Sequence, residues 1–370
     1  MNSLEANVSE EVKEVKVIAV GEELIPSNPF RFKNLENQYR RTAKLAVDYF
    51  RKNYKLSYQP IIRYDFGSNI KDGFTSLTKD ALIVTGFLYS DEAHKASLLA
   101  RNQGLVYLNS VSPLEDIHTS SFIKGLGFRS SQQDQALAAI KNEVKTAGAH
   151  NILFFPKTSS VNEVHARNIK ANFPIDNEIS YIESYSDTKN MRFSAAKVNL
   201  FMAGYGFEHI DTIKDLMTRY PNIEFTIIGT HQWSYCSELM NRVLKGLPIN
   251  AYIVTEFIDY RNSCGSGDNH EDPVKKMQCS FMESYKKNFG EYPEEAIEYS
   301  IFDSILISLI TLNDPQVKNR NDVLSKFRSF DFHGAAGSYF FRDGLVERSV
   351  FLSKWEKGRF VPLKQVSVRS

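Results

Sequence analysis

The sequence lacks the short motifs by which many nucleotide-binding and hydrolytic proteins are recognised. Its 370 residues contain no GxxxxGK[ST] loop, no GxGxxG turn, no GxSxG elbow and no HExxH pair. Each of these motifs places backbone N–H groups, a nucleophile or two metal ligands where the chemistry requires them. Their absence argues against an NTPase, a dinucleotide-dependent enzyme, a serine hydrolase and a zinc protease.

An excess of charge of one sign and long apolar runs are also missing. Lys and Arg number 45 and Asp and Glu 44, so the formal net charge is +1. Such a chain has no overall field that attracts nucleic acid or an anionic membrane. No segment approaches the roughly 18 apolar residues that span a membrane. The polar, acidic first 15 residues lack the apolar core of a signal peptide. We therefore expect a cytoplasmic protein or one whose export signal is absent from this sequence.

Cysteine is scarce, with three residues in all. None forms a CxxC pair or a metal-ligand spacing with histidine, so no metal site is predicted. Cys264 and Cys279 bracket a polar loop and could close it as a disulfide, a bond typical of oxidising compartments; free thiols are the alternative. Cys236 is then left over, and we expect it to be buried and inert.

The sequence is rich in apolar strand-like runs that alternate with amphipathic helical segments. Strands separated by helices of ten to fifteen residues predict βαβ units and parallel sheets. The pattern occurs once before about Arg129 and once after it, and the length suits two domains, so we expect an α/β protein of two Rossmann-like lobes. The predicted strands cover residues 15–20, 61–66, 81–86, 105–110, 151–156, 179–185, 197–205, 225–230 and 251–257. The predicted helices cover residues 34–53, 87–104, 132–148, 161–173, 209–220, 273–290 and 293–312.

Two segments interrupt this alternation. Residues 332–363 read as a β-meander, with turns at Arg342-Asp343-Gly344 and Lys357-Gly358. Residues 64–84, between the second and third predicted strands, are short, and we expect their helix to be reduced or missing.

Polar and aromatic side chains follow five predicted strands at their carboxyl ends, the edge at which open α/β sheets bind ligands. The helix that begins near Ser90 also favours an anion at its N-terminus. Each residue alone has an ordinary alternative, because Ser90 or Asp91 caps a helix well and His231 suits a hydrogen-bonded loop. Together these side chains predict a polar cleft. The candidates are Tyr89, Ser90, Asp91, Ser110, Val111, Ser112, Lys157, Ser159, Tyr205, Phe207, His231 and Gln232.

Four stretches resemble the type I periplasmic solute-binding proteins, especially the leucine/isoleucine/valine-binding receptors of ABC importers. They are residues 81–113, 122–144, 293–310 and 332–363, of which the last is the most specific. The resemblance runs over nearly the whole chain from Lys16 onward. It implies two lobes that the chain connects by three crossings and that close on a ligand by hinge motion.

The resemblance also implies boundaries and partners. The first lobe would comprise residues 14–127 and 261–332, and the second residues 128–260 and 333–370, after a disordered lead-in over residues 1–13. The third crossing would lie near the turn from Gly334 to Gly337. We expect a monomer in the periplasm or cell envelope that works with an ABC permease or a cell-envelope protein, and that needs no cofactor and binds no nucleic acid.

The family's binding residues carry over in part. Ser90 matches the serine that holds the ligand carboxylate, and Tyr205 or Phe207 matches the second-lobe aromatic residue. The acidic residue for the ligand ammonium should fall near Thr230, His231 and Gln232, where no carboxylate occurs. Because burying an ammonium group without a carboxylate is costly, this departure weakens the case for an α-amino acid. The expected ligand is a small polar molecule, either an amino acid or a related compound.

Two other functions compete with a solute receptor. One is a regulatory protein of the same fold with a degenerate cleft, similar to the outer-membrane lipoproteins that activate penicillin-binding proteins. The other is an enzyme that uses His231 with Asp91 or Glu256. We do not expect an enzyme, because no nucleophile, base and orienting group emerge together.

Overall fold

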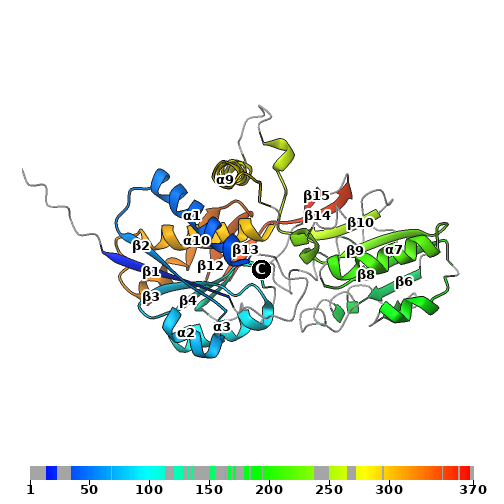
Figure 1. Ribbon diagram of the computed structural model, residues 1–370, viewed down its shortest axis with the longest axis horizontal. Helices are drawn as coiled ribbons and strands as arrows, with labels where there is room; N and C mark the ends of the chain where they lie inside the picture. The colour runs from blue at the N-terminus through cyan, green and yellow to red at the C-terminus, as the bar shows by residue number, and fades with distance from the viewer. Residues whose placement is uncertain are drawn as a thin grey trace, which may run out of the picture.

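The chain folds into two α/β lobes, each built around its own sheet (Figure 1). A computed structural model describes residues 14–22, 35–67, 69–112, 121–127, 150–154, 179–182, 185–193, 195–204, 206–236, 250–264, 272–293, 296–343, 345–356 and 359–366, together with the single positions 132, 136, 140, 163, 166, 167, 170 and 171. The two-lobed α/β prediction is confirmed.

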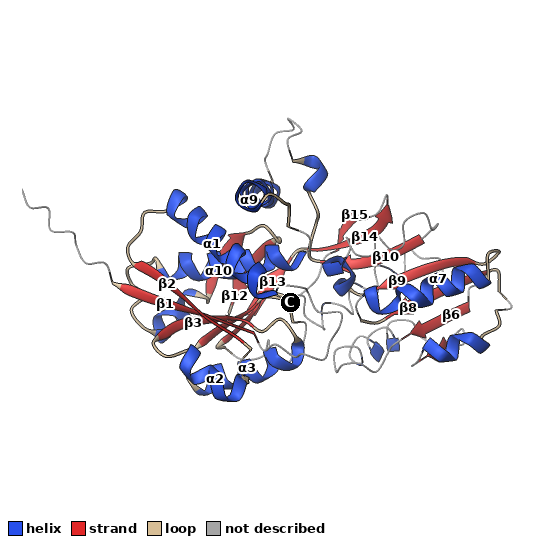
Figure 2. Ribbon diagram, viewed as in Figure 1, coloured by secondary structure: helices blue, strands red, loops and turns tan. Residues whose placement is uncertain are grey.

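The first lobe has a five-stranded parallel sheet in the order β2-β1-β3-β4-β5. Successive residues of a strand face opposite sides, so β1 contributes Val17 and Ala19 to one core and Ile18 and Val20 to another. Helices α2 and α3 cover the first face, and α1, α9 and α10 cover the second (Figure 2). The strands are β1 (Val15–Glu22), β2 (Gln59–Phe66), β3 (Ala81–Gly86), β4 (Val106–Asn109) and β5 (Ile123–Gly125). The helices are α1 (Leu35–Asn53), α2 (Ile70–Leu77), α3 (Ser90–Asn102), α9 (Pro273–Phe289), α10 (Ala296–Leu312) and α11 (Arg320–Lys326).

Helix α10 is the buried centre of the first lobe. All of its residues except Ile310 are buried. The helix packs against α1 and β3, and it shares a core with Tyr339, Phe341 and Val346 near the chain end. Its serines satisfy their hydroxyl groups locally, as Ser304 donates to the carbonyl of Ile301 and Ser308 to that of Ser304. None of the helices in the described part of the chain combines the length and apolarity that crossing a membrane requires.

The second lobe has a seven-stranded sheet in the order β15-β14-β10-β9-β8-β6-β7. Strands β6 to β10 run parallel, and the antiparallel hairpin of β14 and β15 extends the sheet beyond β10. The elements of this lobe are β6 (His150–Phe154), β7 (Ile179–Ile182), η1 (Tyr185–Asn190), β8 (Lys197–Met202), η2 (Gly206–His209), α7 (Ile210–Arg219), β9 (Glu224–Gly229), η3 (His231–Cys236), β10 (Asn250–Thr255), β14 (Val350–Glu356) and β15 (Arg359–Val366).

The predicted β-strands at the chain end are confirmed, but the place where the chain leaves the first lobe is not the expected one. Strands β11 (Ser329–His333), β12 (Ser338–Arg342) and β13 (Leu345–Arg348) form a separate antiparallel sheet. Tyr339, Phe341 and Val346 lie in the same core as α10, so residues 333–348 belong with the first lobe. The chain therefore enters the second lobe at Ser349, between β13 and β14. The turn at Gly334 to Gly337 joins two strands of one lobe and is not a crossing.

The helix expected to be reduced or missing between β2 and β3 is present as α2, which has only eight residues. The side chain of Asn69 caps it by accepting from the N–H of Lys71. Ile70, Phe74 and Leu77 follow helical spacing and are buried. The helix is two turns long, too short for a periodicity argument to detect reliably.

Candidate ligand-binding site

The N-terminus of α3 lies at the carboxyl edge of the first-lobe sheet. Tyr89 occupies the N-cap position, and its side chain makes no capping hydrogen bond. Ser90 begins the helix and accepts a hydrogen bond from the hydroxyl of Ser112, with 3.0 Å between the two oxygens. Ser112 follows β4, so the fold brings together two predicted site residues that are 22 positions apart.

The loop after β4 is shaped by the side chain of Asn109. Its Oδ1 accepts from the backbone N–H of Val111 at 3.0 Å and of Ser112 at 2.8 Å. This turn directs the hydroxyl of Ser112 toward Ser90 and places the hydroxyl of Ser110 3.4 Å from that of Thr85 on β3. Asn109 was not predicted, although an Asn before a Ser-rich loop is typical of such a turn.

A buried carboxylate that the sequence did not reveal fixes the other side of this edge. Glu22 ends β1 and is 1% exposed. Its Oε2 accepts from the N–H of Leu88 at 2.8 Å and from the hydroxyl of Tyr39 at 3.5 Å. Burial raises the pKa of Tyr39 well above its ordinary value, so the phenol stays a donor. Glu22 thereby ties the loop between β3 and α3 to β1.

Gly86 allows that loop to pass close to the neighbouring strand. Its φ is +106°, and a Cβ there would lie 2.0 Å from the carbonyl oxygen of Gly21. Only glycine fits this position, which is where the polypeptide turns from β3 toward the start of α3.

In the second lobe, the segment after β9 forms the short helix η3 at the carboxyl edge of the sheet. Thr230 donates to the carbonyl of Gly204, two residues after β8, with a distance of 2.9 Å. His231 and Gln232 are 2% and 5% exposed. Burial lowers the pKa of His231 to about 3, so this imidazole is neutral near pH 7.

A second histidine, His209, packs against Trp233 of η3. The Nε2 of His209 lies 2.8 Å from the carbonyl oxygen of Ala203, and its ring stacks on that of Trp233 with centroids 6.0 Å apart. Burial lowers the pKa of His209 to about 4, while its bond to Ala203 opposes that shift. The second-lobe edge therefore presents neutral, hydrogen-bonding groups in this segment.

The remaining predicted residues have different outcomes. Val111 belongs to the first-lobe core, so its side chain is structural. Asp91 is exposed in the first turn of α3, and Phe207 falls within η2. Lys157, Ser159 and Tyr205 lie outside the described residues.

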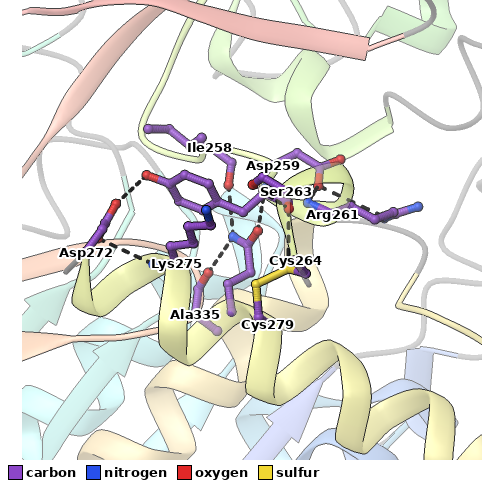
Figure 3. Close-up of a disulfide and its surroundings, with 11 residues drawn as sticks. Ile258, Asp259, Arg261, Ser263, Cys264, Asp272, Lys275, Cys279 and Ala335 are labelled. Carbon is purple, nitrogen blue, oxygen red and sulfur yellow. Dashed lines mark hydrogen bonds and ion pairs between the residues drawn. A yellow bond between two sulfur atoms is a disulfide. The ribbon is translucent and has the colours of Figure 1, made fainter. Parts of the chain in front are cut away.

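The disulfide prediction is confirmed. Cys264 and Cys279 are bonded, which joins the segment after β10 to helix α9 (Figure 3). Cys236 ends η3. Within the described residues, no three His, Cys, Asp or Glu side chains gather closely enough to hold a metal ion.

Glu256, one of the two carboxylates considered for an enzyme, is committed to a different partner. Its Oε1 lies 3.8 Å from Nη1 of Arg348, and both side chains are almost fully buried. This buried carboxylate is therefore engaged in an ion pair with Arg348.

Comparisons with known proteins identify the fold. No family model and no curated protein matches the chain. Among solved structures, it is similar to the branched-chain amino acid transporter substrate-binding protein LivJ from Streptococcus pneumoniae in complex with isoleucine. The identity is 15% and the TM-score 0.72, over 96% of this chain and 100% of that one. An ABC transporter solute-binding protein from Rhodopseudomonas palustris in complex with 3,4-dihydroxy benzoic acid has 13% identity and a TM-score of 0.72, over 96% and 98% of the chains.

A third similar structure is a solute-binding protein from R. palustris in complex with benzoate, with 12% identity and a TM-score of 0.71 over 96% and 97% of the chains. The structural neighbours are type I periplasmic binding proteins, and this chain has their fold. The resemblance noted in the sequence is confirmed at the level of the fold.

Proposed function

We propose that the protein is a receptor that captures a small carboxylate-bearing solute between its lobes by hinge closure and delivers it to an ABC-type permease. The observation that carries the proposal is the likeness of the whole chain to solute-binding proteins, over 96% of its length at a TM-score of 0.72. The N-terminus of α3, with the hydrogen-bonded hydroxyls of Ser90 and Ser112 beside it, supports an anion at the first-lobe edge.

The second-lobe edge favours an acid without an amino group. The first three residues after β9 are Thr230, neutral His231 and Gln232, and the carboxylate of Glu256 pairs with Arg348. A ligand ammonium would lack a negative partner in this segment, and desolvating it would be costly. The neighbours' ligands include both isoleucine and benzoates. Between these classes, the residues here favour an aromatic or other simple carboxylic acid.

The proposed location is the periplasm or cell envelope. Support comes from the disulfide between Cys264 and Cys279, because such bonds persist in oxidising compartments and are rare in a reducing cytosol. The proposed partners are the solute and a permease, and the proposed role involves no catalysis.

The test is a thermal-shift titration with benzoate and 4-hydroxybenzoate against leucine and isoleucine. A ligand at one hundred times its Kd adds about 2.7 kcal/mol of stability. For lobes of this size that corresponds to a rise in Tm of roughly 5 °C or more. We expect the benzoates to raise Tm and the amino acids to leave it unchanged.

Substitution of Ser90 locates the site. Ser90→Ala removes a hydroxyl beside the proposed carboxylate, and we expect a Kd at least about tenfold weaker for the acid that binds, the effect of losing one hydrogen bond to a charged group. Ser97→Ala is the matched control, since Ser97 lies on the same helix and donates to the carbonyl of His94. Equal affinity of both variants would place the ligand elsewhere.

The outcome of the ligand panel also decides between functions. Shifts with leucine or isoleucine and not with benzoates would overturn the ligand class but keep the receptor. No shift with any small molecule would favour a regulatory protein that binds a partner protein, to be sought by pull-down. The sequence offered a reduced or missing helix before β3 in favour of that alternative; the helix is present but has only eight residues.

A further inference from the structure

One buried side chain, that of Arg348, touches the chain at all three places where it passes between the lobes. Arg348 is itself the last residue of β13, next to the crossing at Ser349. Its Nη1 donates to the carbonyl of Leu126 at 2.8 Å and lies 3.8 Å from Oε1 of Glu256.

Leu126 and Glu256 mark the other two crossings. Leu126 follows β5 and packs in the first-lobe core, while Ala136, ten residues later, packs in a second-lobe core. Glu256 follows β10 of the second-lobe sheet, and the next residue, Phe257, lies 5.1 Å from the first-lobe ring of Tyr299. The two segments are 130 residues apart in the sequence, and the guanidinium group of Arg348 links them.

The first-lobe side of this junction is held firmly. The Nη2 of Arg348 donates to the carbonyl of Ala336 at 2.8 Å, and its guanidinium carbon lies 4.3 Å from the centre of the Tyr339 ring. Asp303 on α10 accepts from the N–H groups of Ala335 and Ala336 and from the hydroxyl of Tyr339, at 2.6, 2.8 and 2.9 Å. The turn that receives Arg348 is therefore anchored to the most buried helix of the lobe.

Helix α9 adds a second anchor. The amide of Gln278 donates to the carbonyls of Ile258 and Ala335, both at 2.9 Å, and accepts from the N–H of Tyr260 at 2.6 Å. Figure 3 shows Ile258 and Ala335 near the disulfide between Cys264 and Cys279. The segment that follows the second crossing is thereby fixed to the turn that holds Arg348.

We propose that Arg348 is a positioning residue that couples the three crossings and limits how far the lobes reorient about them. With the guanidinium in place, the three crossing segments move together and stay fixed to the first lobe. Without it, each crossing bends on its own and the lobes sample a wider range of orientations. If the protein is the receptor proposed above, a wider range of lobe orientations also lowers the fraction of molecules that can bind the ligand. The apparent affinity then falls in proportion to that fraction. Only this consequence rests on the proposed function.

The test measures the distance between the lobes without any ligand. Spin labels are attached through p-acetylphenylalanine at two exposed positions, Leu98 on α3 and Asp211 on α7, so that the cysteines stay untouched. Pulsed electron paramagnetic resonance at pH 8 then gives the distribution of distances. We expect Arg348→Met to widen this distribution roughly twofold and Arg348→Lys to widen it less, because an ammonium keeps the charge but not the two-pronged donor.

A matched arginine separates positioning from stability. Arg320 donates to the carbonyls of Ala81, Gln103 and Thr78, all within the first lobe. We expect Arg320→Met to lower Tm and leave the distance distribution unchanged. If Arg348→Met lowered Tm in the same way with an unchanged distribution, Arg348 would be a structural residue and the proposal would be wrong.

A second variant tests the proposal if Arg348→Met does not fold. Glu256→Gln keeps the shape of the side chain and removes its charge beside Arg348, so a widened distribution would support the proposal and an unchanged one would overturn it. These distances involve no ligand, so they stand or fall independently of the thermal-shift panel that tests the receptor function.

Discussion

Acidification from pH 7.5 to 4.5 is expected to lower the free energy of unfolding of the wild-type protein more than that of the double variant His209→Gln, His231→Gln. The expected difference between the two decreases is about 5 kcal/mol. Burial lowers the pKa of His209 to about 4 and that of His231 to about 3. An unfolded histidine titrates near 6.5, so between these values the unfolded chain binds protons that the folded chain does not. The stability from both neutral rings is present above pH 6.5 and is lost as the pH falls.

The single variant His209→Gln should account for about half of that difference, at roughly 1.4 kcal/mol per pH unit over the two units between pH 6.5 and 4.5. Chemical denaturation followed by tryptophan fluorescence is a direct measurement, because Trp233 stacks on His209. At pH 7.5 we expect His209→Gln to be less stable than wild type, since it loses the contacts with Trp233 and Phe154. The two stabilities should converge as the pH falls.

The comparison with a variant is needed because Asp303 acts in the opposite direction. Burial raises the pKa of its carboxyl group to about 7, against the hydrogen bonds that it accepts. The stability that it contributes is complete below the unfolded value of 3.8 and is lost as the pH rises through 7. This contribution cancels between wild type and variant. His94→Gln, on the partly exposed surface of α3, serves as control. A double variant whose stability ran parallel to wild type from pH 7.5 to 4.5 would show that the buried rings accept protons without cost.

Removal of the disulfide is expected to lower the free energy of unfolding by about 3 kcal/mol, the effect of releasing a loop of this length in the unfolded chain. Cys264 and Cys279 are 15 positions apart and join the segment after the second crossing to α9. The bonded geometry is supported by neighbouring contacts, since the hydroxyl of Tyr260 donates to Asp272 at 2.6 Å and Asp272 caps α9. The change to make is the double variant Cys264→Ser, Cys279→Ser.

Urea unfolding by far-ultraviolet circular dichroism, with and without reductant, measures the effect. Reductant should destabilise the wild type toward the variant and leave the variant unchanged. Identical unfolding midpoints for wild type and variant under oxidising conditions would show that the bond contributes nothing to stability. A variant that still responds to reductant would point to an intermolecular disulfide through Cys236 of two molecules.

The sequence by itself determined the two α/β lobes, the position of most strands and the nature of the C-terminal strands. These features follow from local signals, because apolar runs such as residues 81–86 and helical spacing such as that of residues 34–53 are legible without tertiary contacts. The pairing of Ser90 with Ser112 was also within reach, since both follow strands that end at the same sheet edge. The sequence left open whether the helix before β3 was reduced or missing, because the eight residues of α2 carry too little periodicity to decide.

Only the tertiary structure decided which lobe strands β12 and β13 join and which side chains hold the three crossings together. Strands β12 and β13 have the same alternating pattern whichever core they cover, and contacts with α10 place them in the first lobe. Glu22, Asp303 and Arg348 read in the sequence as ordinary charged residues, which are usually solvated. Their burial depends on partners 66, 33 and 222 positions away, and no local pattern records a contact over such separations.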